Sequence, residues 1–401
     1  MGYTPPEKIL AKYAAVLVNF ALNSGEGVKS GEVVRVSVPE SAKLMYAPLR
    51  NALLKAGAFP MMELLAQDIA AADVFSLASD EQLTFFPKSY YRGIVEQIDH
   101  SIFIIAEQDK YELKGVDAKK IMLQSNALKP YREWRDAKEA AGKFTWTLGM
   151  YGTKAMADDV GMSEEEYWQQ IIAACYLDQP DPIAEWRKTC KELARIQAAL
   201  NQLNCEHLEL KAEGINLKVG IGEGRRWLGG SGRNIPSFEL FISPDYRQTE
   251  GEIFFNQPLY RYGNVIKDIY LRFKAGKVVE CRAATNQAIL EEMIATPGAD
   301  QIGEFSLTDG RFSKITRVMG ETLFDENIGG PQGNTHIALG NAYQDSYTGD
   351  ASKVTQEEWQ HLGYNQSAVH TDIISTAARC VTASMKDGTR QIIYDQGKFL
   401  V

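Results

Sequence analysis

The run VVRVSV occupies residues 33–38 and has the β-branched composition and the length of one buried strand. A helix is expected over 41–56, and the apolar run over 58–64 predicts a second strand. Another helical segment over 80–97 leads to the wholly apolar stretch 102–106. Strands that alternate with helices and are apolar on both faces are typical of a parallel sheet covered on both sides. The first half of the chain is therefore predicted to be an α/β domain.

The pattern changes near residue 206. Residues 107–205 are predicted to be mostly helical, with a capping pattern at the start of 163–174 and a long helix from about 181 to 203. Alternating apolar residues on either side of Glu213 and Gly214 then predict a β-hairpin, and strand-like alternation continues to the end of the chain. We therefore expect two domains: residues 1–205 with the parallel sheet, and residues 206–401 as a strand-rich α+β domain.

Composition excludes several classes of partner. The chain has 401 residues, more than one hydrophobic core of roughly 250–300 residues accommodates, so two domains are expected. A net charge of −9 without a long basic run argues against nucleic-acid and anionic membrane partners. No apolar stretch of roughly 18 residues and no secretory signal are visible, and the five cysteines include no CxxC pair. We expect a cytoplasmic protein without a disulfide framework.

Histidine is scarce, and three of the five histidines lie within residues 336–370. His370 and Asp372 stand two residues apart, so on an extended segment their side chains share a face at roughly 6–7 Å and could bind one cation. His336 follows the glycine-rich segment 328–333 and precedes an apolar run. The alternatives are a histidine merely oriented by its neighbouring carboxylate and a histidine that caps an ordinary turn.

Two carboxylates stand alone in apolar surroundings. Glu239 is the only charge in IPSFELFI at residues 235–242, and Glu304 is the only charge in IGEFSL at residues 302–307. A carboxylate buried without a partner is costly, so each is a candidate metal ligand. Each would also suit the solvent face of an alternating strand, which is the more frequent outcome, and spacing alone leaves this choice open.

The sequence lacks the motifs of nucleotide binding and of serine hydrolases. The glycine-rich stretch 222–232 lacks both the GxGxxG pattern and the lysine of a phosphate-binding loop. We therefore expect a turn or loop there, and we predict no dinucleotide or other organic cofactor. No GxSxG sequence is present, which disfavours a serine hydrolase.

Several ordered segments carry a family resemblance. They are Asp178–Pro182 with Trp186, Asn234–Ser237 before Glu239, Gly303-Glu304, Thr322–Asn327, His336–Gly340 with Tyr343, Asn365–Asp372, and Asp387–Thr389. Together they resemble the thermophilic metallo-aminopeptidases of the aminopeptidase T and aminopeptidase S type. Two features depart from the family pattern: Phe238 stands where the family has glycine, and the connection over 328–334 is longer. Both leave the substrate preference open.

The resemblance implies the site and the assembly. It implies a homodimer in which residues 1–205 shape a cavity and residues 206–401 form the catalytic domain with two metal ions. The implied ligands are Glu239, Glu304, His336, His370 and Asp372, with Glu304 bridging the metals. Three carboxylates and two imidazoles suit Zn²⁺, Co²⁺ or Mn²⁺.

The activity that follows is the hydrolysis of N-terminal residues from short peptides by a water that bridges two metals. Glu326 is the candidate proton carrier, with Glu304 as the alternative, and Tyr343 is a candidate hydrogen-bond donor to the tetrahedral oxyanion. A metal-dependent amidohydrolase acting on a non-peptide or modified amide is one alternative. A relative that kept the fold without turnover is the other.

Overall fold

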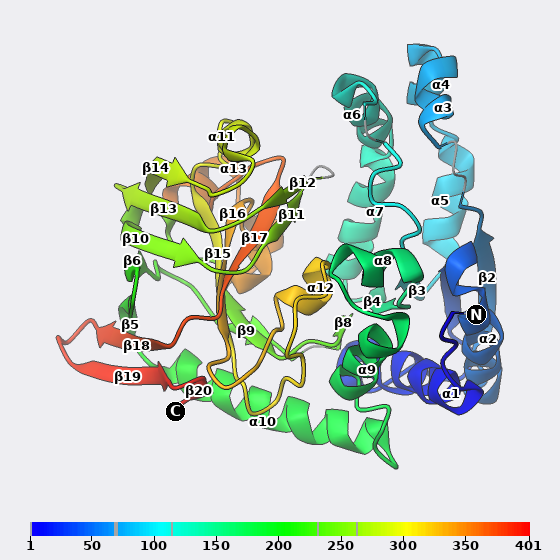
Figure 1. Ribbon diagram of the computed structural model, residues 1–401, viewed down its shortest axis with the longest axis horizontal. Helices are drawn as coiled ribbons and strands as arrows, with labels where there is room; N and C mark the ends of the chain where they lie inside the picture. The colour runs from blue at the N-terminus through cyan, green and yellow to red at the C-terminus, as the bar shows by residue number, and fades with distance from the viewer. Residues whose placement is uncertain (1, 68–70, 114, 231, 262–263) are drawn as a thin grey trace. The chain divides into compact units, whose positions relative to one another are not determined.

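The computed structural model describes residues 2–67, 71–113, 115–230, 232–261 and 264–401 (Figure 1). The chain divides into two compact units. The N-terminal unit comprises Met1–Arg187 and Ser231–Ile235, and the C-terminal unit comprises Lys188–Gly230 and Pro236–Val401. The functional division predicted near residue 205 stays a prediction. Among the described residues, no helix has both the length and the apolar character that crossing a membrane requires.

The N-terminal unit contains the predicted parallel sheet. Its five strands follow the order β2-β1-β3-β4-β8, and each neighbouring pair is parallel. The strands are β1 (Val33–Pro39), β2 (Phe59–Leu65), β3 (His100–Ile105), β4 (Thr145–Met150) and β8 (Asn234–Ile235). Val34, Val36 and Val38 of β1 are fully buried, which places the quoted run at the centre of this unit's core.

Ten α-helices described by the structure belong to the first half of the chain. They are α1 (Glu7–Val16), α2 (Tyr46–Lys55), α3 (Ala71–Leu77), α4 (Asp80–Thr84), α5 (Lys88–Gln97), α6 (Ala118–Ala127), α7 (Lys129–Ala140), α8 (Lys154–Asp159), α9 (Glu164–Ala174) and α10 (Pro182–Gln202). The capping pattern before α9 is confirmed: the Ser163 hydroxyl accepts from the Glu166 N–H, and the Glu166 carboxylate accepts from the Ser163 N–H.

Two local predictions in this half were incomplete. The helix predicted over 80–97 is two helices, α4 and α5, because Pro87 has no N–H to donate and disfavours helical backbone at the residue before it. The segment 107–205 is not purely helical, because β4 lies within it. This strand pairs with β3 on one side and β8 on the other, and such long-range partners leave little trace in the local sequence.

The C-terminal unit is built on two antiparallel sheets, as the strand-rich pattern predicted. The eight-stranded sheet follows the order β14-β13-β10-β6-β5-β18-β19-β20, and the five-stranded sheet follows β17-β16-β15-β9-β7. The predicted hairpin is confirmed, since β5 and β6 pair from His207↔Gly220 to Ala212↔Ile215.

The bounds of the elements in this unit are as follows. The strands are β5 (Cys205–Ala212), β6 (Ile215–Gly220), β7 (Leu228–Gly229), β9 (Glu239–Ile242), β10 (Glu250–Phe255), β11 (Leu259–Arg261), β12 (Asn264–Ile266), β13 (Ile269–Lys274), β14 (Lys277–Arg282), β15 (Ile302–Thr308), β16 (Asn334–Gly340), β17 (His370–Ser375), β18 (Arg379–Met385), β19 (Arg390–Asp395) and β20 (Lys398–Phe399). The helices are α11 (Gln287–Ile294), α12 (Thr322–Asp325) and α13 (Gln356–His361).

One apolar cluster joins the two sheets. Phe305 and Ile337 of the five-stranded sheet share it with Leu217, Ile253 and Leu271 of the eight-stranded sheet, and all five side chains are nearly or fully buried. Burying each such side chain contributes roughly 1.5–3 kcal/mol. Because side chains alternate along a strand, the residues between these apolar ones point to the other face of the five-stranded sheet.

Candidate metal centre

That other face of the five-stranded sheet carries the predicted site residues. Glu304 on β15 pairs with Ala338 on β16, and Ala338 pairs with Asp372 on β17. Residues paired directly across an antiparallel sheet point to the same face, so Glu304 and Asp372 do so. His370, two residues before Asp372, also shares this face.

The register of the paired strands places His336 and Glu239 on the same face of the sheet. His336 pairs with Ser306, two residues after Glu304, and Glu239 pairs with Thr308, four residues after it. The pairing of four strands therefore gathers side chains that lie up to about 130 positions apart in the sequence. The sequence had predicted only the local pair, His370 and Asp372, from spacing.

The donor atoms form two groups that share one carboxylate. His336 Nε2 lies 3.1 Å from Glu239 Oε2 and 3.2 Å from Glu304 Oε1. His370 Nε2 lies 3.5 Å from Glu304 Oε2 and 3.4 Å from Asp372 Oδ1. Within each group one donor atom from every residue lies within 4.8 Å of the others. The two oxygens of Glu304 thus face different groups, an arrangement that suits a carboxylate between two cations.

Burial makes the electrostatics of this cluster strong. Burial alone would lower the pKa of His336, but hydrogen bonding to Glu239 and Glu304 outweighs it and raises the pKa well above the usual range. Burial would likewise lower the pKa of His370, but the carboxylates of Asp372 and Glu304 outweigh this effect and raise that pKa to about 11. Burial would raise the pKa of Asp372, but the contact with His370 outweighs this effect and lowers that pKa to about 2.

The donor set fits divalent cations. The two groups hold three carboxylates and two imidazoles, and the carboxylate of Glu326 lies close to them. Burial raises the pKa of Glu239 despite His336, which reflects the cost of placing like charges out of water. Carboxylate oxygens with imidazole nitrogens are the ligands of Zn²⁺, Co²⁺ and Mn²⁺, and two divalent ions would balance four carboxylates.

Two contacts orient the candidate ligands, and neither was predicted. The buried Ser306 hydroxyl donates to Glu239 Oε2 at 2.8 Å. The His370 Nδ1 lies 2.8 Å from the Asn341 carbonyl oxygen; if it donates there, Nε2 is left as the acceptor that faces Glu304 and Asp372. Ser306 could have been found from the sequence, because it follows Glu304 by two residues on a predicted strand. A backbone carbonyl such as that of Asn341 gives no sequence signal.

Glu326 and Tyr343 lie close to the cluster. Glu326 is buried directly after α12, and its carboxylate lies outside the two donor groups while Asn327 Nδ2 approaches its Oε1 at 3.4 Å. Burial and the carboxylates of Glu239 and Asp372 hold the pKa of Glu326 well above its usual range. The Tyr343 ring lies 4.8 Å from that of His370. Partial burial and the nearby carboxylate of Glu304 raise the pKa of Tyr343, so its hydroxyl keeps its proton.

The two departures from the family pattern also border this cluster. Phe238 is fully buried, and its N–H donates to Asn327 Oδ1 at 2.6 Å. Within the longer connection 328–334, Asn334 Nδ2 donates to the carbonyls of Glu326 and Ile328 at 2.9 and 2.7 Å. Both features therefore help to hold the backbone next to Glu326.

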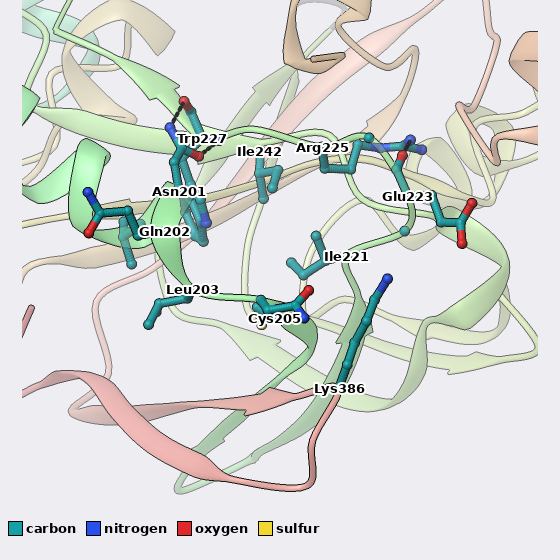
Figure 2. A pocket seen from close by; sticks show the side chains of 14 residues that line it. Asn201, Gln202, Leu203, Cys205, Ile221, Glu223, Arg225, Trp227, Ile242 and Lys386 are labelled. Atoms are coloured by element: carbon teal, nitrogen blue, oxygen red, sulfur yellow. Dashed lines mark hydrogen bonds between the residues drawn. The ribbon is translucent and has the colours of Figure 1, made fainter. Parts of the chain in front are cut away.

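A separate cavity of about 370 Å³ lies between the end of α10 and the loop after β6 (Figure 2). Its main polar groups are already engaged: Asn201 bonds to the backbone of Trp227, and Arg225 donates to the carbonyls of Ser243, Glu223 and Leu362. None of the predicted site residues lines this cavity. The reactive side chains are thus concentrated on the five-stranded sheet.

Comparisons with known proteins extend over nearly the whole chain. Residues 6–399 match the family model described as thermophilic metalloprotease (M29). The chain is 30% identical over 410 residues to aminopeptidase T of Thermus thermophilus, covering 96% of this chain and 98% of the relative. It is 29% identical over 415 residues to aminopeptidase 2 of Geobacillus stearothermophilus, covering 98% of each. The solved structure of wild-type AmpT from Thermus thermophilus matches with a TM-score of 0.84 and 27% identity, over 98% of this chain and 100% of that chain.

Proposed function

The chain belongs to the thermophilic metalloprotease (M29) family, as its motifs predicted, and we propose that it is a metal-dependent aminopeptidase acting on short peptides at a site for two divalent cations. One observation carries the two-cation proposal: the two oxygens of Glu304 face different donor groups. The names of the relatives support the choice of aminopeptidase.

The residues that would hold the cations are those of the two groups. Glu239 and His336 would bind one cation, His370 and Asp372 the other, and Glu304 both. From the donor types we propose Zn²⁺, Co²⁺ or Mn²⁺. Cations bound there would supply Lewis-acid polarisation of the scissile carbonyl and a water of lowered pKa.

The proton carrier in this proposal is Glu326. Its carboxylate is buried close to both groups, where it would accept a proton from water and pass it to the leaving amine. Tyr343, which keeps its hydroxyl proton, would donate a hydrogen bond to the oxygen that becomes negative as the carbonyl is attacked. The concentration of carboxylates also favours a substrate with a free, positively charged α-amine.

The proposed assembly is a homodimer. Leu77 at the end of α3, Phe85 after α4 and Met122 on α6 are 83%, 74% and 60% exposed. Large apolar side chains that stay in water are typical of surfaces covered by a partner. Light scattering at micromolar concentration should give the mass of two chains, and the mass of one chain would contradict the proposal.

The activity is tested with metal-stripped enzyme reloaded with Co²⁺, Zn²⁺ or Mn²⁺. Leucine p-nitroanilide and dipeptides should be hydrolysed, and the N-acetylated forms should not, because acetylation removes the free amine. Hydrolysis of other amides with no activity on peptides would identify an amidohydrolase. Cation binding without turnover of any amide would indicate a relative that lost catalysis.

A further inference from the structure

An uncharged groove of about 510 Å³, with both polar and apolar lining, lies next to the proposed metal centre, where β16 ends and β17 begins. Its walls come from the segments after α11, after β16, at the start of α13 and before β17. Of its polar side chains, four are carboxamides and two are hydroxyls: Asn341, Gln344, Gln356, Gln366, Thr296 and Ser367. None of the described residues that line it is charged.

One residue connects the groove with the surroundings of the metal centre. Asn341 lines the groove, and the backbone carbonyl of the same residue accepts the contact from His370 Nδ1 at 2.8 Å. Gln344 also lines it and directly follows Tyr343, whose ring lies 4.8 Å from that of His370. The segment 341–344 therefore contributes both to the groove wall and to the surroundings of His370.

Exposure shows which side chains of the centre reach solvent. Glu304 and His336 are 3% and 1% exposed, whereas the His370 side chain is 22% and Tyr343 is 44% exposed. These two more exposed residues are also the ones next to the groove wall, since His370 contacts Asn341 and Tyr343 precedes Gln344.

The groove wall is built before any ligand binds. Gln356 Nε2 donates to Gln366 Oε1 at 2.5 Å, and the Ser367 hydroxyl donates to the Pro297 carbonyl at 2.8 Å. The buried Asn365 amide ties the neighbouring backbone together through the carbonyls of Gly298 and Gly340. Ordering a ligand against a preformed wall costs less entropy than ordering both.

Its chemistry matches a peptide main chain. A carboxamide both donates and accepts, as each peptide unit does, and after the Gln356–Gln366 bond one side chain retains its acceptor and the other its donor. An uncharged wall has no preference for charged side chains. We propose that this groove binds the main chain of the substrate on the C-terminal side of the scissile bond, so that peptides of three or more residues are better substrates than dipeptides.

This inference rests on the proposed function and is tested by substrate length. In the double variant Gln356→Ala with Gln366→Ala, kcat/KM for Leu-Gly-Gly-Gly should fall roughly 10-fold, the loss expected for about one net hydrogen bond. The value for leucine p-nitroanilide should stay unchanged. Gln360→Ala is the matched control, because Gln360 is an exposed glutamine of α13 that does not line the groove.

Two results would overturn the proposal. Equal losses on both substrates would show a structural effect, and an unchanged tetrapeptide value would show that the groove binds no substrate. If the wild-type enzyme hydrolyses neither compound, the proposed function fails, and the groove is then judged by calorimetry. Leu-Gly-Gly-Gly should bind the wild type about 10-fold more tightly than the double variant, and equal affinities would reject the groove.

Discussion

Replacing Glu304 with glutamine should abolish most of the stabilisation that divalent cations give to the C-terminal unit. Glutamine keeps the size of the side chain but removes a negative charge and one strong donor from each of the two groups, since Glu304 belongs to both. The change therefore weakens both proposed cation sites at once, whereas a change at Glu239 or Asp372 affects one group directly.

The size of the effect follows from linkage. A cation at about 100 times its dissociation constant stabilises the folded state by about 2.7 kcal/mol per site. For a unit of this size, each kcal/mol corresponds to roughly 2–4 °C in Tm, so the wild type should gain about 5–11 °C per site at saturation. The Glu304→Gln variant should gain less than roughly a third of that at the same cation concentration.

The assay is thermal unfolding of chelator-treated protein with and without added Co²⁺ or Zn²⁺, together with the metal content of each sample. Glu213→Gln is the matched control, because Glu213 is an exposed residue in the β5–β6 turn. A Glu304→Gln variant that keeps the full rise in Tm and the metal content of the wild type would refute the shared-ligand reasoning.

Three other outcomes are expected. Ser306→Ala should weaken cation affinity roughly 10–100-fold, because Glu239 loses the hydroxyl that orients it, whereas an unchanged titration would show that this contact is dispensable. Glu326→Gln should lower kcat by roughly 10²–10⁴-fold with metal content retained, and a near-normal kcat would assign the proton transfer elsewhere. Cation binding should release protons and weaken as pH falls, because His336 and His370 have raised pKa values and must be neutral to act as ligands. Calorimetry in two buffers of different ionisation enthalpy measures this release, and equal heats would argue against it.

The sequence predicts elements better than it predicts their partners. The β-branched run at 33–38 and the α9 capping box both gave the correct element, because each depends on neighbouring residues. Strand β4 was missed because its hydrogen bonds go to β3 and β8, the latter more than 80 residues away.

The same distinction applies to the site. His370 and Asp372 were placed on one face by a spacing rule, and the structure brings their side chains within 3.4 Å. For Glu239, the residues alone also allowed a solvent-facing position, which is the more frequent outcome for a single carboxylate on an alternating strand. What decides its position is the pairing of β9 with β15, which sets Glu239 opposite Thr308 and beside Ser306. That register is stabilised by the apolar core on the opposite face of the sheet, to which Leu240 and Ile242 of the same strand contribute.

Anomalous scattering from crystals grown with Zn²⁺ or Co²⁺ tests the central claim most directly. Data at the metal edge should show two peaks roughly 3.5–4 Å apart on either side of the Glu304 carboxylate, one touching His336 and the other His370. No peak at Glu304, or peaks held by other side chains, would contradict the proposed two-cation centre.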